Sequence, residues 1–483
     1  MEKIKSYLEE YSYLKSIQSL LHWDMETMMP EGAIDDRAKR LSYVQGKMHA
    51  HLTDSKYKKL LKEFSEQQKK SKLQKSLLKE LEWDFKLNSA LPQKHVEEVS
   101  MATSHAGHTW AKAKKTNDLK LFLPHLQKLI DLKRRESTFY KTKNAYDGLI
   151  QLHDKEFNSE QIKKIFNELK VGLTKIASDV NQEGRFVKVK DIKGPFQIED
   201  QKALSLFVAR KFGLPETHSR LDVSTHPFSI NISPLDQRIT TRYDVSHLDS
   251  LSSTMHEVGH ALYELNLPRQ WEGTPLQEAV SLSVHESQSR FWENIIGRSR
   301  AFSHFIFPEM KKVFPKSMKG MDPEKLFLYF NKSVPGLIRV ESCELYYNFH
   351  IIIRFEIEEM IFNQGLKAKD IPGVWKELYK KYLGIGPKTD AEGILQDSHW
   401  AGGAFGYFPT YTLGNLISGS LFMKLKKQIP DLDKKISKGD FAPVLKYLVD
   451  NIHSKGRSIN SADLVGELDV NDYLHYLKTK FQG

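Results

Sequence analysis

The chain has 483 residues, of which 40% are hydrophobic and 28% charged, so an intrinsically disordered protein is excluded as the default reading. Its net charge is +11, but the lysines are interleaved with acidic residues at helical spacing, which indicates solvated helix faces and argues against a nucleic-acid partner. A single cysteine excludes an internal disulfide, and the lack of an apolar leader or a long apolar run predicts a cytoplasmic protein without a membrane partner.

Helices are predicted for the first part of the chain. Apolar residues recur at three- and four-residue steps from Ile4 to Leu21, which is typical of an amphipathic helix. A break around Pro30 precedes a second predicted helix over 35–51. Further helices are predicted as antiparallel hairpins over 73–87, 96–115 and 121–143.

Strand-like alternation of apolar and polar residues replaces the helical pattern between about residues 184 and 244. The alternating segments are 185–189, 228–233 and 237–243. A turn at 234–236 separates the last two, so they could pair as a hairpin. Helical patterns then resume after Asp249 almost to the end, and the sequence predicts a mainly α protein with a small antiparallel sheet.

The segment His256-Glu257-Val258-Gly259-His260 can bind a metal ion. Two imidazoles four residues apart face the same side of a helix and can reach one zinc ion, which in catalytic sites keeps a position open for water. Glu257 can then accept a proton from that water. Small and apolar residues surround the motif, so a solvated helix with incidental histidines is the weaker alternative.

A third metal ligand is expected from a second predicted helix that carries His285 and Glu286. The intervening chain leaves room for the first helix to end, for a loop over 268–275 and for a return helix. Two histidines and a glutamate form the ligand set of thermolysin-type catalytic zinc sites, so we favour Glu286. His285 is the alternative ligand.

Further motifs follow one another in a fixed order along almost the whole chain. They comprise Leu21-His22-Trp23-Asp24, His226-Pro227-Phe228, Asp236 with Arg238 and Thr240, the zinc motif, His285-Glu286-Ser287-Gln288-Ser289-Arg290, and Gly393 with Gln396, Asp397, His399 and Trp400. In this order the motifs resemble those of the carboxypeptidase Taq family of zinc metallocarboxypeptidases.

One motif departs from the family pattern I-R-x-x-A-D, because Cys343 stands where the family has its aspartate. One helical turn after Arg339, that aspartate could hold the arginine or orient a metal-site histidine. Cysteine is a weak hydrogen-bond partner, so we expect weaker substrate binding at a competent zinc centre. The alternative is that Glu341 or Glu344 has taken over the role.

The resemblance implies a mainly α fold with a deep active-site groove, a zinc ion at its floor and N-terminal helices as a lid. We therefore expect one metallocarboxypeptidase domain over 1–483, with a lid region over 1–145 and a catalytic region over 180–483. The implied activity is removal of C-terminal amino acids from peptides with broad specificity. The implied cofactor is Zn²⁺, with Co²⁺ as an alternative, and the implied assembly is a homodimer.

Recognition of a free C-terminal carboxylate favours an arginine, whose planar fork donates two parallel hydrogen bonds. Arg339 is the first candidate because its motif resembles the family's. Arg238 and Arg354 are reserves, and each could instead form a structural ion pair. His226 is expected in the groove through its motif.

Negative charge that develops on the reacting carbonyl needs a donor besides the metal, and His399 with Tyr407 or Tyr411 is expected to supply it. Glu257 is expected to pass its accepted proton to the leaving amino acid. Two alternatives stay open at this point. One is an oligoendopeptidase of similar architecture, and the other is a non-catalytic helical scaffold that retains a metal site.

Overall fold

The computed structural model describes residues 2–466 and 468–482, and the chain divides into two compact units. Unit 1 comprises residues 1–89, 189–330 and 414–469, and unit 2 comprises residues 90–188, 331–413 and 470–483. Each unit is built from segments that are far apart in sequence. The units therefore do not follow the predicted regions 1–145 and 180–483, whose roles as lid and catalytic region stay predictions.

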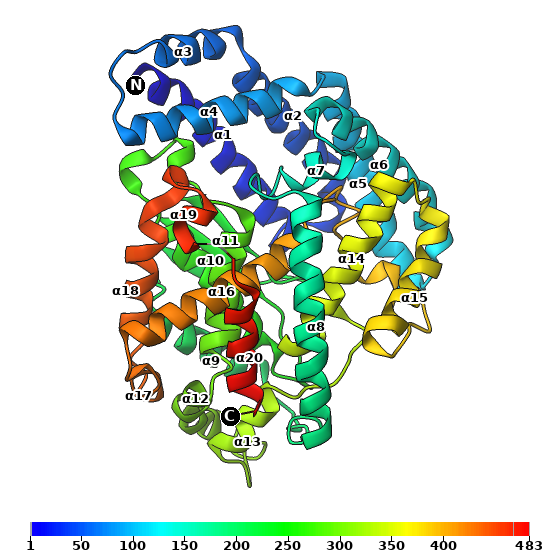
Figure 1. Cartoon of the computed structure of the whole chain (residues 1–483), viewed down its shortest axis with the longest axis vertical. Helices are drawn as coiled ribbons and strands as arrows, with labels where there is room; N and C mark the ends of the chain where they lie inside the picture. The colour runs from blue at the N-terminus through cyan, green and yellow to red at the C-terminus, as the bar shows by residue number, and fades with distance from the viewer. Residues whose placement is uncertain (1, 467, 483) are drawn as a thin grey trace. The chain divides into compact units, whose positions relative to one another are not determined.

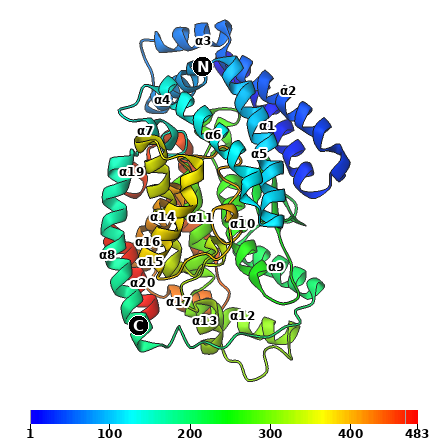
Figure 2. The ribbon, with the colours of Figure 1, turned by 90° about the vertical axis from the view of Figure 1, so that its right-hand side faces the viewer.

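Unit 1 contains the zinc-motif helix α10 (Asp249–Leu265) and the helix that follows it, α11 (Leu282–Arg290). The other helices of this unit are α1 (Glu2–Thr27), α2 (Ile34–Thr53), α3 (Ser55–Ser65), α4 (Lys72–Ala90), α9 (Ile198–Phe212), α12 (Arg300–Val313), α13 (Pro323–Phe330), α17 (Leu432–Ser437), α18 (Ala442–Asn451) and α19 (Ser461–Val465). The predicted helices over 4–21, 35–51 and 73–87 are confirmed, and α1 and α2 lie side by side (Figures 1 and 2).

The N-terminal helices of unit 1 are joined by one apolar cluster. Helix α3 places Tyr57, Leu61 and Phe64 on one face, and all three are buried. They pack with Leu8 of α1 and with Leu276 from the segment before α11. Each buried side chain stabilises the folded state by about 1.5–3 kcal/mol. The cluster therefore attaches the N-terminal helices to the segment that leads into α11.

Ion pairs reinforce this connection. The guanidinium of Arg457 contacts carboxylate oxygens of Glu80 at 2.7 Å, Asp84 at 3.0 Å and Glu278 at 2.7 Å. Lys15 of α1 also contacts Glu278, at 2.7 Å. Because Glu80 is buried and the Arg457 side chain is only 13% exposed, these pairs are less screened than surface salt bridges.

The sheet of unit 1 contains β1 (Ser219–Val223), β2 (Ser229–Ser233) and β3 (Asp236–Thr241) in the order β1-β3-β2. The predicted antiparallel hairpin of β2 and β3 is confirmed. The third strand is β1, which pairs parallel to β3, so the sheet is mixed rather than antiparallel. The predicted strand over 185–189 is wrong, because residues 185–187 form a turn in which the ring of Phe186 is buried.

Unit 2 is built around α14 (Glu344–Gln364), which is buried on most of its faces. Its other helices are α5 (Gln93–Thr116), α6 (Leu119–Tyr140), α7 (Ala145–Ile150), α8 (Ser159–Glu183), α15 (Ile371–Leu383) and α20 (Val470–Gln482). α5 and α6 pack together as the predicted hairpin, and α8 and α20 lie side by side although they are far apart in sequence (Figures 1 and 2). One of the points at which the chain passes from unit 2 to unit 1, residues 413 and 414, falls within α16 (Pro409–Gln428).

The mainly α fold with a small sheet is thus confirmed. Across residues 2–466 and 468–482, no helix combines the length and the apolarity that crossing a membrane would require.

Candidate metal centre

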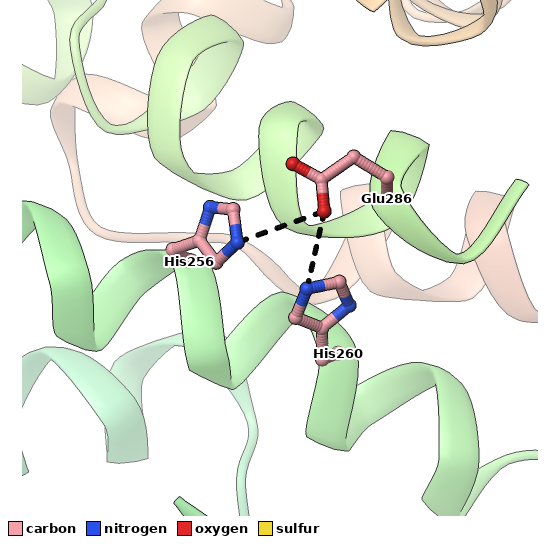
Figure 3. Close-up of side chains that lie close together, drawn as sticks. All are labelled: His256, His260 and Glu286. Carbon is pink, nitrogen blue, oxygen red and sulfur yellow. Dashed lines mark ion pairs between the residues drawn. The ribbon is translucent and has the colours of Figure 1, made fainter. Parts of the chain in front are cut away.

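Three side chains of unit 1 converge as a possible ligand set. Helix α10 carries His256 and His260, and α11 carries Glu286 (Figure 3). The Oε2 atom of Glu286 lies 3.7 Å from Nε2 of His256 and 3.4 Å from Nε2 of His260. The three candidate ligand atoms all lie within 4.8 Å of one another, so one ion could contact all of them.

The close approach of α10 and α11 depends on Gly259, which lies inside the zinc motif. A Cβ atom at this position would lie 2.6 Å from the carbonyl oxygen of Gln288 and 2.7 Å from Cα of Ser289. Gly414 of α16 has a similar role, because a Cβ there would lie 3.0 Å from Cβ of Glu286. Residues without a side chain therefore let two neighbouring helices enclose the glutamate ligand.

Glu293, which is not among the residues predicted from the sequence, contacts the outer ring nitrogen of His256. Its Oε2 atom lies 2.8 Å from Nδ1 of His256, and Arg290 and Arg298 each donate to its carboxylate at 3.1 Å. Arg290 also donates from Nε to Glu286 at 2.8 Å. A carboxylate on the outer ring nitrogen fixes the orientation of a metal-binding histidine and raises its basicity. The signal available in the sequence was the shared helix face of positions 286, 290 and 293.

The buried charges in this cluster set the protonation of its members. Burial would raise the pKa of Glu286, but His256 and Arg290 hold it well below its usual range. Burial would likewise raise the pKa of Glu293, but Arg290 and His256 lower it to about 2. Burial lowers the pKa of His260 to about 3, so its imidazole is neutral and can donate a lone pair to a metal. Glu286 and Glu293 are therefore anionic, and the neutral ring of His260 can bind a metal ion.

Glu257, the predicted base, is 5% exposed. Burial raises the pKa of its carboxyl group to about 7, against a lowering by the neighbouring His256. A pKa near neutrality suits a group that must both accept and return a proton.

The residues present fit a divalent metal ion. Two imidazole Nε2 atoms and one carboxylate oxygen are the donor set of catalytic zinc sites. The hydrogen bond between Nδ1 of His256 and Glu293 leaves the Nε2 atom facing Glu286, as a ligand requires. Buried carboxylates also gain from a nearby cation.

His285, the alternative third ligand, does not join the three convergent donors. Its Nε2 atom lies 2.9 Å from Oε1 of Glu264, whose Oε2 atom accepts from Asn231 of β2 at 2.7 Å. Its ring stacks on that of His260 with the centroids 4.4 Å apart. His285 therefore packs beside the ligand set and links it to the sheet.

A cavity of about 610 Å³ opens beside this centre within unit 1. Its walls come from α1, α4, β2 and the segment before α11, and His285 and Glu264 line it. Because His285 stacks on His260, one part of the cavity adjoins the candidate ligands.

Arg238 and His226, predicted to bind substrate, lie in or beside the sheet of unit 1. Arg238 donates from Nε and Nη2 to the two carboxylate oxygens of Asp236 at 2.9 and 2.8 Å, and it stacks on Trp23 with 4.3 Å to the ring centroid. Trp23, from the motif near the N-terminus, therefore contacts Arg238, from the motif in β3. His226 is exposed in the connection from β1 to β2, and its carbonyl oxygen accepts from Ser224 at 2.6 Å.

The remaining predicted residues gather in unit 2, where Asp397 bridges two arginines. Arg339 donates from Nε to one oxygen of Asp397 at 2.9 Å, and Arg354 donates from Nε to the other at 2.7 Å. Tyr347 accepts from Nη1 of Arg339 at 2.7 Å. Burial would raise the pKa of Asp397, but the two arginines hold it well below its usual range. Two cations that share one carboxylate leave an excess positive charge suited to an anion.

His399, Tyr407 and Tyr411 also lie together in unit 2. Nε2 of His399 is 3.0 Å from the hydroxyl of Tyr411, and its ring centroid is 5.5 Å from that of Tyr407. Burial, followed by the nearby Arg339, lowers the pKa of His399 to about 3, so the ring is neutral. Arg339 also faces the ring of Tyr411, 5.0 Å from its centroid.

The expectation for Cys343 is wrong in its geometry. Arg339 lies in a short 3-10 turn (Arg339–Glu341), and Cys343 is the N-cap of α14, so the two side chains do not share a helix face. The carboxylate partner of Arg339 is Asp397, and the Sγ atom of Cys343 lies 3.6 Å from Oγ of Ser333. Glu344 instead contacts Lys480 at 2.7 Å. Cys343 therefore gives no geometric reason to expect weaker substrate binding through Arg339.

Replacing Glu293 by glutamine is expected to lower the affinity for zinc by about 10- to 100-fold, because the negative charge beside Nδ1 of His256 is lost. Competition with a chromophoric zinc chelator measures this affinity. Glu264→Gln is the matched control, since Glu264 bonds His285 rather than a candidate ligand, and it is expected to leave the affinity unchanged. Equal affinities for Glu293→Gln and the native chain would contradict the supporting role.

The family model described as carboxypeptidase Taq (M32) metallopeptidase matches residues 3–481. The chain is 36% identical to thermostable carboxypeptidase 1 of Pyrococcus furiosus, with 99% of this chain and 98% of that protein covered. It is 33% identical to carboxypeptidase 1 of Bacillus subtilis, with 98% and 96% covered. Among solved structures, Pyrococcus furiosus carboxypeptidase Apo-Mg has a TM-score of 0.96 at 35% identity, with 99% of this chain and 98% of that chain covered. Trypanosoma cruzi metallocarboxypeptidase 1 has a TM-score of 0.95 at 32% identity, with 100% and 99% covered.

Proposed function

The chain belongs to the carboxypeptidase Taq (M32) family of metallopeptidases and is a metallocarboxypeptidase, and we propose how its residues hydrolyse the C-terminal peptide bond. The observation that carries the proposal is the convergence of His256, His260 and Glu286 beside Glu257. When bound by these three ligands, Zn²⁺ would polarise the scissile carbonyl and lower the pKa of a water molecule to about 7.

Glu257 is the general base and then the general acid of the proposed mechanism. Its carboxylate accepts a proton from the attacking water and donates that proton to the amino group of the leaving amino acid. A pKa of about 7, which results from burial, lets the group exist in both forms near neutral pH. Glu293 holds His256 in place, and Arg290 and Arg298 donate hydrogen bonds to Glu293.

The family requires a divalent metal, and we propose Zn²⁺ as the physiological ion, with Co²⁺ able to replace it. Two imidazole donors support this proposal, because Mg²⁺ prefers an octahedral shell of oxygen ligands whereas zinc accepts histidine nitrogens.

For substrate recognition, we propose that Arg339 binds the free C-terminal carboxylate. Its support is the excess positive charge around Asp397 and the slight exposure of the Arg339 side chain, 7%, against 0% for Arg354. His399 and Tyr411 are proposed to donate to the developing oxyanion, with Tyr407 as the second tyrosine candidate. Arg238 and His226 are proposed to contact the peptide further from its C-terminus. Broad residue specificity, a homodimer and a cytoplasmic location complete the proposal.

Converting the C-terminus of a test peptide to the amide is expected to lower kcat/KM by about a hundredfold or more, because a site built for a charged group is left unpaired. Liquid chromatography of the released amino acid or amino-acid amide measures the rate. Arg339→Gln should remove most of the preference for the acid, whereas the native chain keeps it. Equal rates on acid and amide would show that the carboxylate is not what the enzyme recognises.

A further inference from the structure

Glu358 is a fully buried carboxylate on α14 of unit 2 that the proposed mechanism does not use. Its Oε1 atom accepts from the indole Nε1 of Trp400 at 2.7 Å. Its Oε2 atom accepts from the backbone nitrogen of Gly406 at 2.8 Å and from the hydroxyl of Tyr146 at 2.7 Å. A buried carboxylate is costly unless its oxygens are bonded, and both oxygens of Glu358 are.

Two of these three donors delimit one turn of the chain. Trp400 directly follows His399, and Gly406 directly precedes Tyr407, so Glu358 holds the turn 400–406 at both of its ends. The third donor, Tyr146, belongs to α7 and lies outside the turn.

The conformation of Gly406 shows why the turn needs this anchor. Its φ angle is +82°, and a Cβ atom at this position would lie 2.5 Å from the carbonyl carbon of Leu149 in α7. The backbone is therefore pressed against α7 in a conformation that only glycine adopts without strain. Its N–H group points to Glu358, which fixes the point at which the chain turns back towards Tyr407 and Tyr411.

We propose that Glu358 is a positioning residue for the reaction: by bonding Trp400 and Gly406 together, it orients His399 and Tyr411 for the transition state. The inference rests on the roles proposed above for these two side chains. Displacement of a reacting or stabilising group by about 1 Å can cost a hundredfold in rate, so a distant anchor can have a large kinetic effect.

Substitutions can separate positioning from general stability. Glu358→Gln places an amide N–H₂ group where one oxygen accepted a bond, so one end of the turn faces a donor instead of an acceptor. Trp400→Phe removes the indole N–H at one end of the turn and leaves the bond of Gly406 in place. It also removes part of a buried ring that packs on Phe405, and the thermal midpoint reports this loss of packing. Tyr146→Phe is the matched control, because it removes a bond to the same carboxylate without touching the turn.

The experiment measures kcat, KM, thermal midpoint and zinc content on a short peptide for these three variants and for the double variant Glu358→Gln with Trp400→Phe. Glu358→Gln and Trp400→Phe are expected to lower kcat by about tenfold or more with KM nearly unchanged, since a transition-state interaction is affected. The double variant should lose little more than either single one, because both substitutions release the same turn from the same side chain. Tyr146→Phe should lower the thermal midpoint similarly but keep kcat, and zinc content should stay native throughout.

Three outcomes would overturn the inference, and His399→Ala with Tyr411→Phe separates the first two. If both of these variants keep the native kcat, the roles proposed for His399 and Tyr411 fail, and positioning fails with them. If they lose kcat while Glu358→Gln and Trp400→Phe keep it, those roles stand and positioning by Glu358 is refuted. If Tyr146→Phe loses kcat in step with its thermal stability, Glu358 affects kcat only through the stability of the fold. Positioning by Glu358 is then refuted.

Discussion

Replacing Glu257 by glutamine is expected to leave the bound metal in place and to lower kcat by about a thousandfold. The amide has the shape of the carboxyl group but cannot accept a proton from water. Because burial already raises the pKa of Glu257 to about 7, a neutral side chain at this position should not destabilise the fold. Elemental analysis and the release of free amino acid, measured on the same preparation, check both parts of this prediction.

The matched control is Asp249→Asn, which neutralises an exposed carboxylate in the first turn of the same helix. It is expected to leave metal content and kcat unchanged. A Glu257→Gln variant with full metal content and near-native turnover would show that another group is the base.

The second large effect is expected for Glu286→Ala, which should lower metal affinity by well over a hundredfold. Altering a carboxylate behind a ligand already costs about 10- to 100-fold, and here a ligand itself is removed. Arg290 would also lose its hydrogen bond to Glu286 in a buried position. Elemental analysis after dialysis measures the occupancy, and hydrolysis should be lost together with the metal.

His285→Ala distinguishes the two candidate third ligands. It removes the neighbouring side chain, which stacks on His260 but points to Glu264, and it is expected to keep the metal. If His285→Ala loses the metal while Glu286→Ala retains it, the assignment of the third ligand must be reversed.

The candidate metal site could be predicted from sequence because its geometry is mostly local. Positions 256 and 260 share a helix face in any α-helix, and a return helix is the simplest way to bring Glu286 back to them. Glu293 is equally local, but a ligand pattern alone does not indicate which residue bonds the outer nitrogen of His256.

Contacts between distant parts of the sequence could not be predicted in the same way. The expectation for Cys343 assumed one helix from position 339 to 343, whereas a 3-10 turn and a helix N-cap lie there and Asp397 supplies the charge. Nothing in the local pattern of β1 shows that its partner is β3, or that the pairing is parallel. The two units are likewise assembled from interleaved segments, which no composition change marks.

In the proposed mechanism, hydrolysis depends on a metal ion held by His256, His260 and Glu286. The most direct test is to strip the protein with a chelator and to measure the release of C-terminal amino acids while Zn²⁺ is added back. We expect no release from the metal-free protein, a rise to a plateau at one Zn²⁺ per chain, and no rise for Glu286→Ala. Full activity in the metal-free protein, or a native titration curve for Glu286→Ala, would contradict it.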